Sequence, residues 1–293
     1  MSLETTPRQA ASGSPRAEKT QGRLAALPPA PPTLPGVDLN APEQLRLLRH
    51  LKRFMGEHNP VYSSGDAHVV DCMIRYLSPR RIVGIGFGGS TPVILDTLER
   101  HRGNDIHCTL IGQPPEPFQE VRHQGRLSVL SEPAHAAPAS VFESLGSRDI
   151  VFVEPAHHTS DVNHVIFEVL PVLASDVHVY FSETFCPAPS APAASGQPLR
   201  SRSEAYLLRA FLQHNAEFEI MLFCDYLKRY HCEAVDHSFP ALLLGDPSSI
   251  WMRRREHSMA DAAGYEWHVT TSLAVPEAGD TLPVAVEAER PPS

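Results

Sequence analysis

The feature that most constrains the fold is a repeated alternation of short apolar segments with segments of helical periodicity. Apolar runs predict strands at 81–86, 106–111, 127–130, 149–153 and 177–181. Segments with helical spacing of apolar residues stand between them at 91–102, 139–145 and 161–173. Because a helical segment can carry the chain back between strands, we expect an α/β protein. Its fold would be Rossmann-like and doubly wound, with a mostly parallel sheet and helices on both faces.

The same periodicity continues on both sides of this alternation. Helices are predicted near 40–55, 66–77 and 204–214, a strand at 218–223, and an edge strand at 249–252. Residues 1–36 are rich in Pro, Ser, Thr and Ala, and we expect a disordered leader. We expect the folded domain to span residues 37–256, and residues 257–293 to form a largely irregular tail. A proline-rich stretch at 187–198 is interpreted as a lid or a disordered loop.

Composition restricts the classes of partner. The formal net charge of −9 argues against a protein that binds nucleic acid by neutralising phosphates. No apolar run approaches the roughly 20 residues of a membrane span, and the N-terminus lacks the apolar core of a signal peptide. The five cysteines are scattered without a paired motif, which suits a reducing compartment. We therefore expect a cytoplasmic protein without nucleic-acid or membrane partners; a homo-oligomer stays open.

A glycine-rich turn follows the first strand of the alternation. Gly86 and Gly88 allow the backbone to pass close to a ligand, and Ser90 and Thr91 open the next helix, whose N-terminal N–H groups are free to bind. In a parallel α/β sheet, ligands bind beyond the carboxyl ends of the strands. This turn is therefore the first candidate for a binding site.

Several segments, in order along the chain, resemble class I S-adenosylmethionine (SAM) dependent methyltransferases of the small-molecule type. The segments are Y-S-S-G-D-A at 62–67, G-I-G-F-G-G-S-T at 84–91, D-I-V-F-V-E-P-A-H at 149–157, and further matches at 160–163, 167–171, 204–212 and 248–253. The resemblance implies the methyltransferase type of Rossmann-like sheet, SAM as the cofactor and methyl transfer to a small molecule. It implies cofactor-binding roles for Asp66, Gly86, Gly88, Ser90, Thr91 and Gln113, and catalytic roles for Glu154, His157 and Glu183.

The chain departs from the family pattern at positions that normally bind the cofactor. Gly84 and Gly112 stand where the family has acidic residues, the second of which binds the ribose hydroxyls; Gln113 or Glu116 are the nearest possible substitutes. Ser182-Glu183 replaces a His-Asp pair. Two alternatives therefore stay open: a catalytically silent subunit that keeps the fold, and an enzyme that uses SAM for other chemistry, such as intramolecular cyclisation.

The sequence gives no firm metal site. Glu154, His157, His158 and Glu183 follow the fourth and fifth strands, and a carboxylate–histidine set there can act as a general base or bind a divalent ion. His231, Cys232 and His237 match no known zinc spacing. We assign no metal.

Overall fold

A computed structural model describes residues 34–55, 64–100, 105–119, 126–154, 159–186 and 199–256. All of them belong to the compact unit Met1–Glu256. The predictions for residues 1–33, His157, the loop 187–198 and the tail 257–293 lie outside the described residues.

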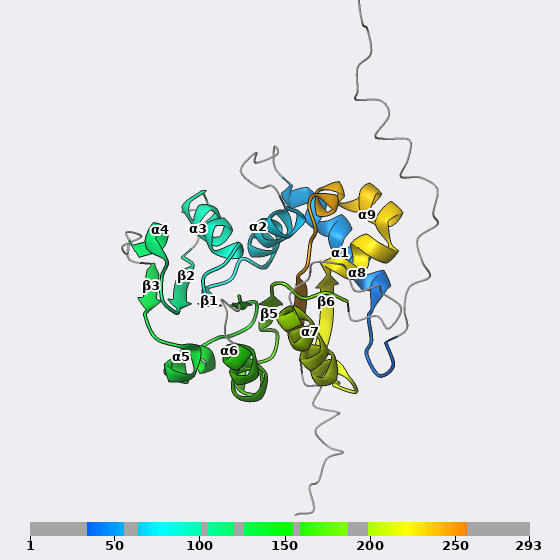
Figure 1. Ribbon diagram of the computed structural model, residues 1–293. Coiled ribbons are helices and arrows are strands. Elements are labelled where there is room, and N and C mark those ends of the chain that lie inside the picture. The colour runs from blue at the N-terminus through cyan, green and yellow to red at the C-terminus, as the bar shows by residue number, and fades with distance from the viewer. Residues whose placement is uncertain are drawn as a thin grey trace, which may run out of the picture. The chain divides into compact units, whose positions relative to one another are not determined.

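The described strands form one seven-stranded sheet in the order β3-β2-β1-β4-β5-β7-β6 (Figure 1). Neighbouring strands from β3 to β5 pair in parallel, and β7 is antiparallel to both β5 and β6. This arrangement confirms the predicted Rossmann-like, doubly wound and mostly parallel sheet, and its strand order is that of the class I methyltransferase type. The strands are β1 Arg81–Ile85, β2 His107–Ile111, β3 Leu127–Leu130, β4 Ile150–Val153, β5 His178–Phe181, β6 Phe218–Phe223 and β7 Ile250–Arg254.

Helices cover both faces of this sheet. In Figure 1, α1, α2 and α3 lie on one face, and α5, α6 and α7 lie on the other. The described helices are α1 Ala41–Leu51, α2 Gly65–Leu77, α3 Ser90–Arg100, α4 Glu116–Gln119, α5 Ser140–Glu143, α6 Thr159–His164, α7 Leu199–Leu212, α8 Cys224–Tyr230 and α9 Cys232–Ser238.

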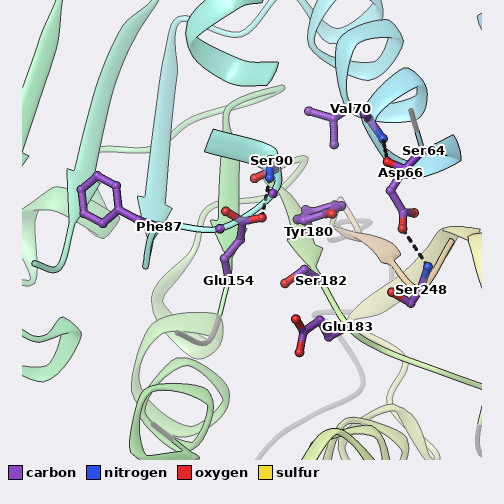
Figure 2. Close-up of a pocket in the computed structure, with 13 residues that line it drawn as sticks. Ser64, Asp66, Val70, Phe87, Ser90, Glu154, Tyr180, Ser182, Glu183 and Ser248 are labelled. Carbon is purple, nitrogen blue, oxygen red and sulfur yellow. Dashed lines mark hydrogen bonds between the residues drawn. The ribbon is translucent and has the colours of Figure 1, made fainter. Parts of the chain in front are cut away.

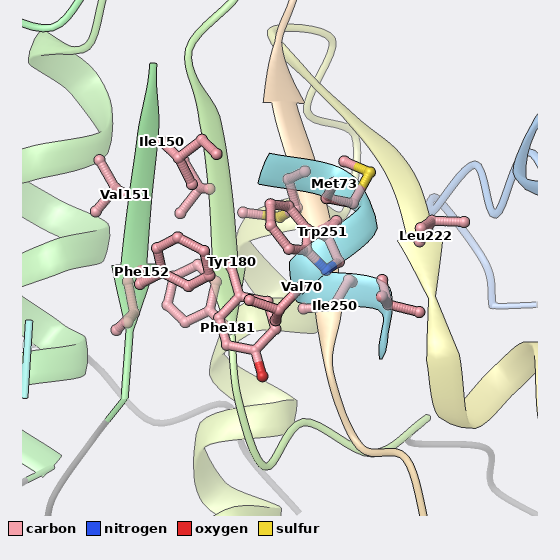
Figure 3. Packing of buried hydrophobic residues seen from close by; sticks show 14 of the residues in the cluster. Val70, Met73, Ile150, Val151, Phe152, Tyr180, Phe181, Leu222, Ile250 and Trp251 are labelled. Carbon is pink, nitrogen blue, oxygen red and sulfur yellow. The ribbon is translucent and has the colours of Figure 1, made fainter. Parts of the chain in front are cut away.

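The expectation of an edge strand at 249–252 is wrong, because β7 lies inside the sheet between β5 and β6. Trp251 at its centre is fully buried, and its ring centroid lies 5.5 Å from that of Phe152 and 5.1 Å from that of Tyr180 (Figure 3). Such a large aromatic side chain gains most from packing on a covered strand. The three rings pack against one another beneath the carboxyl ends of β4 and β5.

The helix expected at 161–173 is divided into three parts. The α-helix α6 ends at His164, a π-helical turn spans Val165–Val169, and a 3₁₀ turn spans Leu170–Val172. Pro171 has no N–H group to donate, so a regular α-helix cannot continue through it.

Packing begins before the expected boundary at residue 37. Leu34 is buried in the core cluster, and the carbonyl of Gly36 accepts a hydrogen bond from His214 N at 2.6 Å. Residues 34–36 therefore belong to the folded unit, although the sequence placed them in the leader.

One buried carboxylate aligns the two central strands. Asp149, just before β4, accepts hydrogen bonds from the backbone N–H groups of Arg80, Arg81 and Gly146 at 2.8–2.9 Å. Because Arg81 begins β1 and Arg80 directly precedes it, this side chain fixes the starts of β1 and β4 relative to each other. Their carboxyl ends are then in register at the opposite edge of the sheet.

Candidate functional site

The chain reverses its direction across the sheet between β1 and β4. From β1 it runs outward to β2 and β3, then returns to place β4 on the other side of β1. Ligands of open α/β sheets bind at such a switch point, beyond the carboxyl ends of the strands. A cavity of about 330 Å³ lies there (Figure 2), within the usual size range of small-molecule sites. Its lining residues are Ser64, Asp66, Ala67, Val70, Phe87, Gly88, Gly89, Ser90, Glu154, Tyr180, Ser182, Glu183 and Ser248.

The glycine-rich turn after β1 forms one wall of this cavity. Gly86 has φ +86°, a conformation that favours glycine, and its N–H donates to the carbonyl of Ile111 at 2.8 Å. Gly88 has another reason to lack a side chain, because a Cβ there would lie 2.8 Å from the carboxyl carbon of Glu154. The turn thus brings its backbone against a carboxylate of the same chain.

Glu154, directly after β4, binds the first turn of α3. Its Oε1 accepts from the backbone N–H of Ser90 at 2.7 Å, and its Oε2 accepts from the hydroxyl of Thr91 at 3.2 Å. Only 5% of the residue is exposed, and this burial raises the pKa of its carboxyl group, while the Ser90 N–H opposes the shift. The predicted catalytic residue therefore lines the cavity with both oxygens already hydrogen-bonded.

Asp66, in the first turn of α2, joins the opposite wall to the segment before β7. Its carboxylate accepts from the backbone N–H of Ser248 at 2.7 Å (Figure 2) and from the hydroxyl of Ser249. Burial raises the pKa of this carboxyl group, and the hydrogen bonds from Ser249 and Ser248 oppose the shift. Asp66, for which the resemblance implies cofactor binding, lines the cavity, and its two oxygens accept hydrogen bonds from Ser248 and Ser249 within the wall.

Glu183 differs from the other two acidic residues of the cavity. It is exposed, follows β5, and makes no hydrogen bond or ion pair among the described residues. Its φ of +52° is uncommon for a residue with a side chain, and such backbone conformations cluster at functional sites. Of the three carboxylates that line the cavity, only that of Glu183 has no hydrogen-bond donor among the described residues, so it can accept a proton from a ligand.

Three residues that line the cavity have no role in the sequence-based prediction: Phe87, Tyr180 and Ser182. Tyr180 lies buried between Asp66 and Glu154, and this burial raises the pKa of its hydroxyl group (Figure 2). Ser182 follows it at the end of β5, and Phe87 lines the rim. The signal that identifies Tyr180 is a hydroxyl-bearing residue in a buried strand that leads to Glu183.

Three of the predicted cofactor-binding residues do not line the cavity. Gln113 is exposed, and its Nε2 donates to the carbonyl of Ser131 at 2.7 Å. Thr91 is buried against Glu154, and Gly86 shapes the turn. Gly88 and Ser90 do line the cavity, and the Ser90 hydroxyl is buried beside the Glu154 carboxylate.

The resemblance implies an acidic residue at the end of β2. In the structure, the backbone conformation at this position favours glycine. Gly112 has φ +130°, and the ring of Phe87 lies 3.6 Å from the position that a Cβ would take there. Phe87 points away from Glu154 (Figure 2) and contacts Phe118, with ring centroids 5.9 Å apart. Aromatic side chains therefore cover the end of this strand.

Two kinds of feature are absent from the described part of the chain. No group of three or more His, Cys, Asp or Glu side chains there could hold a metal ion. No helix there has both the length and the apolar character needed to cross a membrane.

Known proteins resemble this chain in structure but not detectably in sequence. No protein-family model matches the sequence, and no curated protein is significantly similar to it. Among solved structures, the SAH-bound methyltransferase PaMTH1 of Podospora anserina is 17% identical, with a TM-score of 0.42 over 84% of this chain and 100% of that one. Cofactor-bound Rv0187 from MTB is 14% identical, with a TM-score of 0.43 over 78% and 99%. A putative O-methyltransferase from Klebsiella pneumoniae is 11% identical, with a TM-score of 0.40 over 73% and 90%. With TM-scores below 0.5 these similarities carry no weight of their own, and the strand order of this chain establishes its fold.

Proposed function

We propose that this chain binds SAM in the cavity at the switch point and transfers its methyl group to a small-molecule acceptor. The observation that carries the proposal is the charge of the cavity wall. Asp66, Glu154 and Glu183 supply carboxylates, and no Lys, Arg or His lines the cavity among the described residues, which exclude 155–158. A phosphate-bearing cofactor finds no cationic partner on this wall, whereas the sulfonium group of SAM is a cation.

The lining residues fit such a ligand. The turn from Gly86 to Ser90 brings backbone against the cavity, and Gly88 and Gly89 leave room there for a ligand. When bound, SAM supplies an electrophilic methyl group. The end of β2 offers no carboxylate to the ribose, so we expect the other walls of the cavity to contribute most of the affinity.

Glu183 is the proposed general base. Among the described residues its carboxylate has no hydrogen-bond or ion-pair partner; it is exposed and lies two residues after the end of β5, on the cavity wall. A carboxylate in hydrogen-bond reach of an acceptor hydroxyl or amine can take the proton that the acceptor loses. Glu154 is less suited to this step because Ser90 and Thr91 occupy both of its oxygens.

The test is methyl transfer by the full-length protein, measured as SAH release from SAM in the presence of mixed small hydroxyl and amine acceptors. Glu183→Gln should lower turnover by about 100-fold, the usual contribution of a general base, while SAM affinity stays within about twofold. Glu168→Gln, an exposed change on the π-helical turn, is the matched control. Equal turnover of Glu183→Gln and the wild type would contradict the role of Glu183.

A second candidate is a protein that binds SAM without transferring the methyl group. Two observations favour it. Both oxygens of Glu154 and of Asp66 are already hydrogen-bonded within the protein, and aromatic side chains cover the end of β2. SAM binding without SAH release from any acceptor class would support this candidate over the first.

A further inference from the structure

The N-terminal ends of two helices face the same cavity. Ser64 precedes α2, and Ser90 begins α3; both line the cavity. The free N–H groups and the dipole of a helix N-terminus attract anions, so two such ends would normally favour an anionic ligand.

In this chain both ends already have oxygen acceptors of their own. The hydroxyl of Ser64 accepts from the N–H of Ala67 at 3.3 Å, and Asp66 adds a carboxylate to the first turn of α2. At α3 the acceptor is Glu154, whose Oε1 lies 2.7 Å from Ser90 N. An anionic group of a ligand would have to displace these groups.

Glu154 differs from the other two carboxylates of the cavity in its burial, and therefore in how strongly its charge is screened. The exposed Glu183 is screened by solvent ions. Asp66 accepts hydrogen bonds from Ser248 and Ser249, and it is only partly buried. Glu154 is buried beside Gly88, and a Cβ at Gly88 would collide with it. A charge held in a low-dielectric wall acts more strongly on a ligand than an exposed one.

We propose that Glu154 is the residue that makes this cavity selective for cationic ligands, so that it prefers SAM to SAH. The inference rests on the proposed function. SAM and SAH differ by one methyl group and by the positive charge on sulfur. A fixed carboxylate in the wall stabilises the charged form and gives nothing to the neutral thioether. The same preference would assist release of the neutral product after transfer.

The experiment is calorimetric titration of the full-length protein with three probes. SAM carries the charge and the methyl group, SAH carries neither, and sinefungin carries a protonated amine in place of the sulfonium methyl. If charge decides, SAM and sinefungin should bind with similar affinity, each about tenfold or more tighter than SAH. Sinefungin binding no tighter than SAH would overturn the proposal, because shape would then decide.

Two variants test whether Glu154 causes the preference for SAM over SAH. Glu154→Gln keeps an oxygen for the Ser90 N–H and removes the charge, so the three affinities should converge to within about threefold. Glu143→Gln, an exposed change on α5, should keep the wild-type ratios. An unchanged SAM-to-SAH ratio in Glu154→Gln would overturn the role of Glu154.

A measurement on the wild type keeps the test decisive if Glu154→Gln does not fold. The preference for SAM should persist between about 0.05 M and about 1 M salt, because a buried charge is screened little. Loss of the preference at high salt would assign it to an exposed carboxylate such as Glu183 and overturn the proposal. Binding of none of the three probes would contradict the proposed function itself, whereas equal binding of all three contradicts this inference alone.

Discussion

Gly88 and Gly89 are adjacent in the turn after β1 and have very different surroundings. A Cβ at Gly88 would lie 2.8–3.0 Å from three atoms of the Glu154 carboxylate, while a Cβ at Gly89 would meet nothing within 4 Å. A side chain at position 88 must therefore displace a buried, hydrogen-bonded carboxylate. The steric conflict at Gly88 arises within the protein, independently of any ligand.

We therefore expect substitutions at these two glycines to change the free energy of unfolding by different amounts. Gly88→Ala should lower the free energy of unfolding by about 1–3 kcal/mol, since Glu154 loses charged hydrogen bonds when it shifts. Gly89→Ala, the matched control, should change it by less than about 0.5 kcal/mol. Urea unfolding followed by circular dichroism measures both, and equal losses in the two variants would disprove the contact.

At Gly112 the backbone conformation, rather than a neighbouring side chain, opposes the introduction of a side chain. The sequence marks this position as a missing acidic residue, which suggests that a carboxylate could be restored there. With φ at +130°, however, any L side chain is strained, and Gly112→Glu should cost about 1–3 kcal/mol of stability. The same urea unfolding checks this, and a Gly112→Glu protein as stable as the wild type would show that the backbone accommodates a side chain.

Among the elements, β5 contains a buried histidine that makes stability depend on pH. Burial lowers the pKa of His178 to about 4; the Asp176 carboxylate opposes this shift, and the Arg253 and Arg148 guanidinium groups add to it. In the unfolded chain its pKa returns to about 6.5. Between these values the unfolded state binds the proton, so stability falls as the pH drops from about 6.5 toward 4.

Replacement of this histidine should remove its share of the pH dependence. The difference in unfolding free energy between the wild type and His178→Gln should shift by about 2–3 kcal/mol against the wild type between pH 7 and pH 4. Groups common to both proteins cancel in this comparison. A difference that stays constant with pH would show that His178 titrates normally in the folded protein.

The elements predicted from sequence are those with strong local signals. The strand at 150–153 is wholly buried and reads as a continuous apolar run, and the helix at 65–77 has a clear apolar face. The place of β7 could not be predicted in this way, because the spatial order of strands depends on contacts with β5 and β6 that lie 27 or more residues away in sequence. The π-helical turn after His164 left no periodic signal either.

At the scale of the whole molecule, the cavity is assembled from segments far apart in the chain. Ser64–Val70, Phe87–Ser90, Glu154, Tyr180–Glu183 and Ser248 contribute to it. The sequence predicted that strand ends would meet here, since parallel strands present their carboxyl ends at one edge. It could not predict that Glu154 binds the N-terminus of α3 or that Asp66 binds Ser248, because both contacts join residues at least 64 positions apart.

The most direct test of the central claim is calorimetric titration of SAM into the wild type and into Ala67→Trp. Ala67 lines the cavity from α2, so an indole group there should fill much of its volume of about 330 Å³. The exposed change Ala139→Trp is the control. We predict that SAM binds to the wild type and to Ala139→Trp, and that Ala67→Trp shows no binding heat although its melting temperature is retained. Absence of binding to the wild type, or undiminished binding to a folded Ala67→Trp, would contradict the claim that this cavity holds SAM.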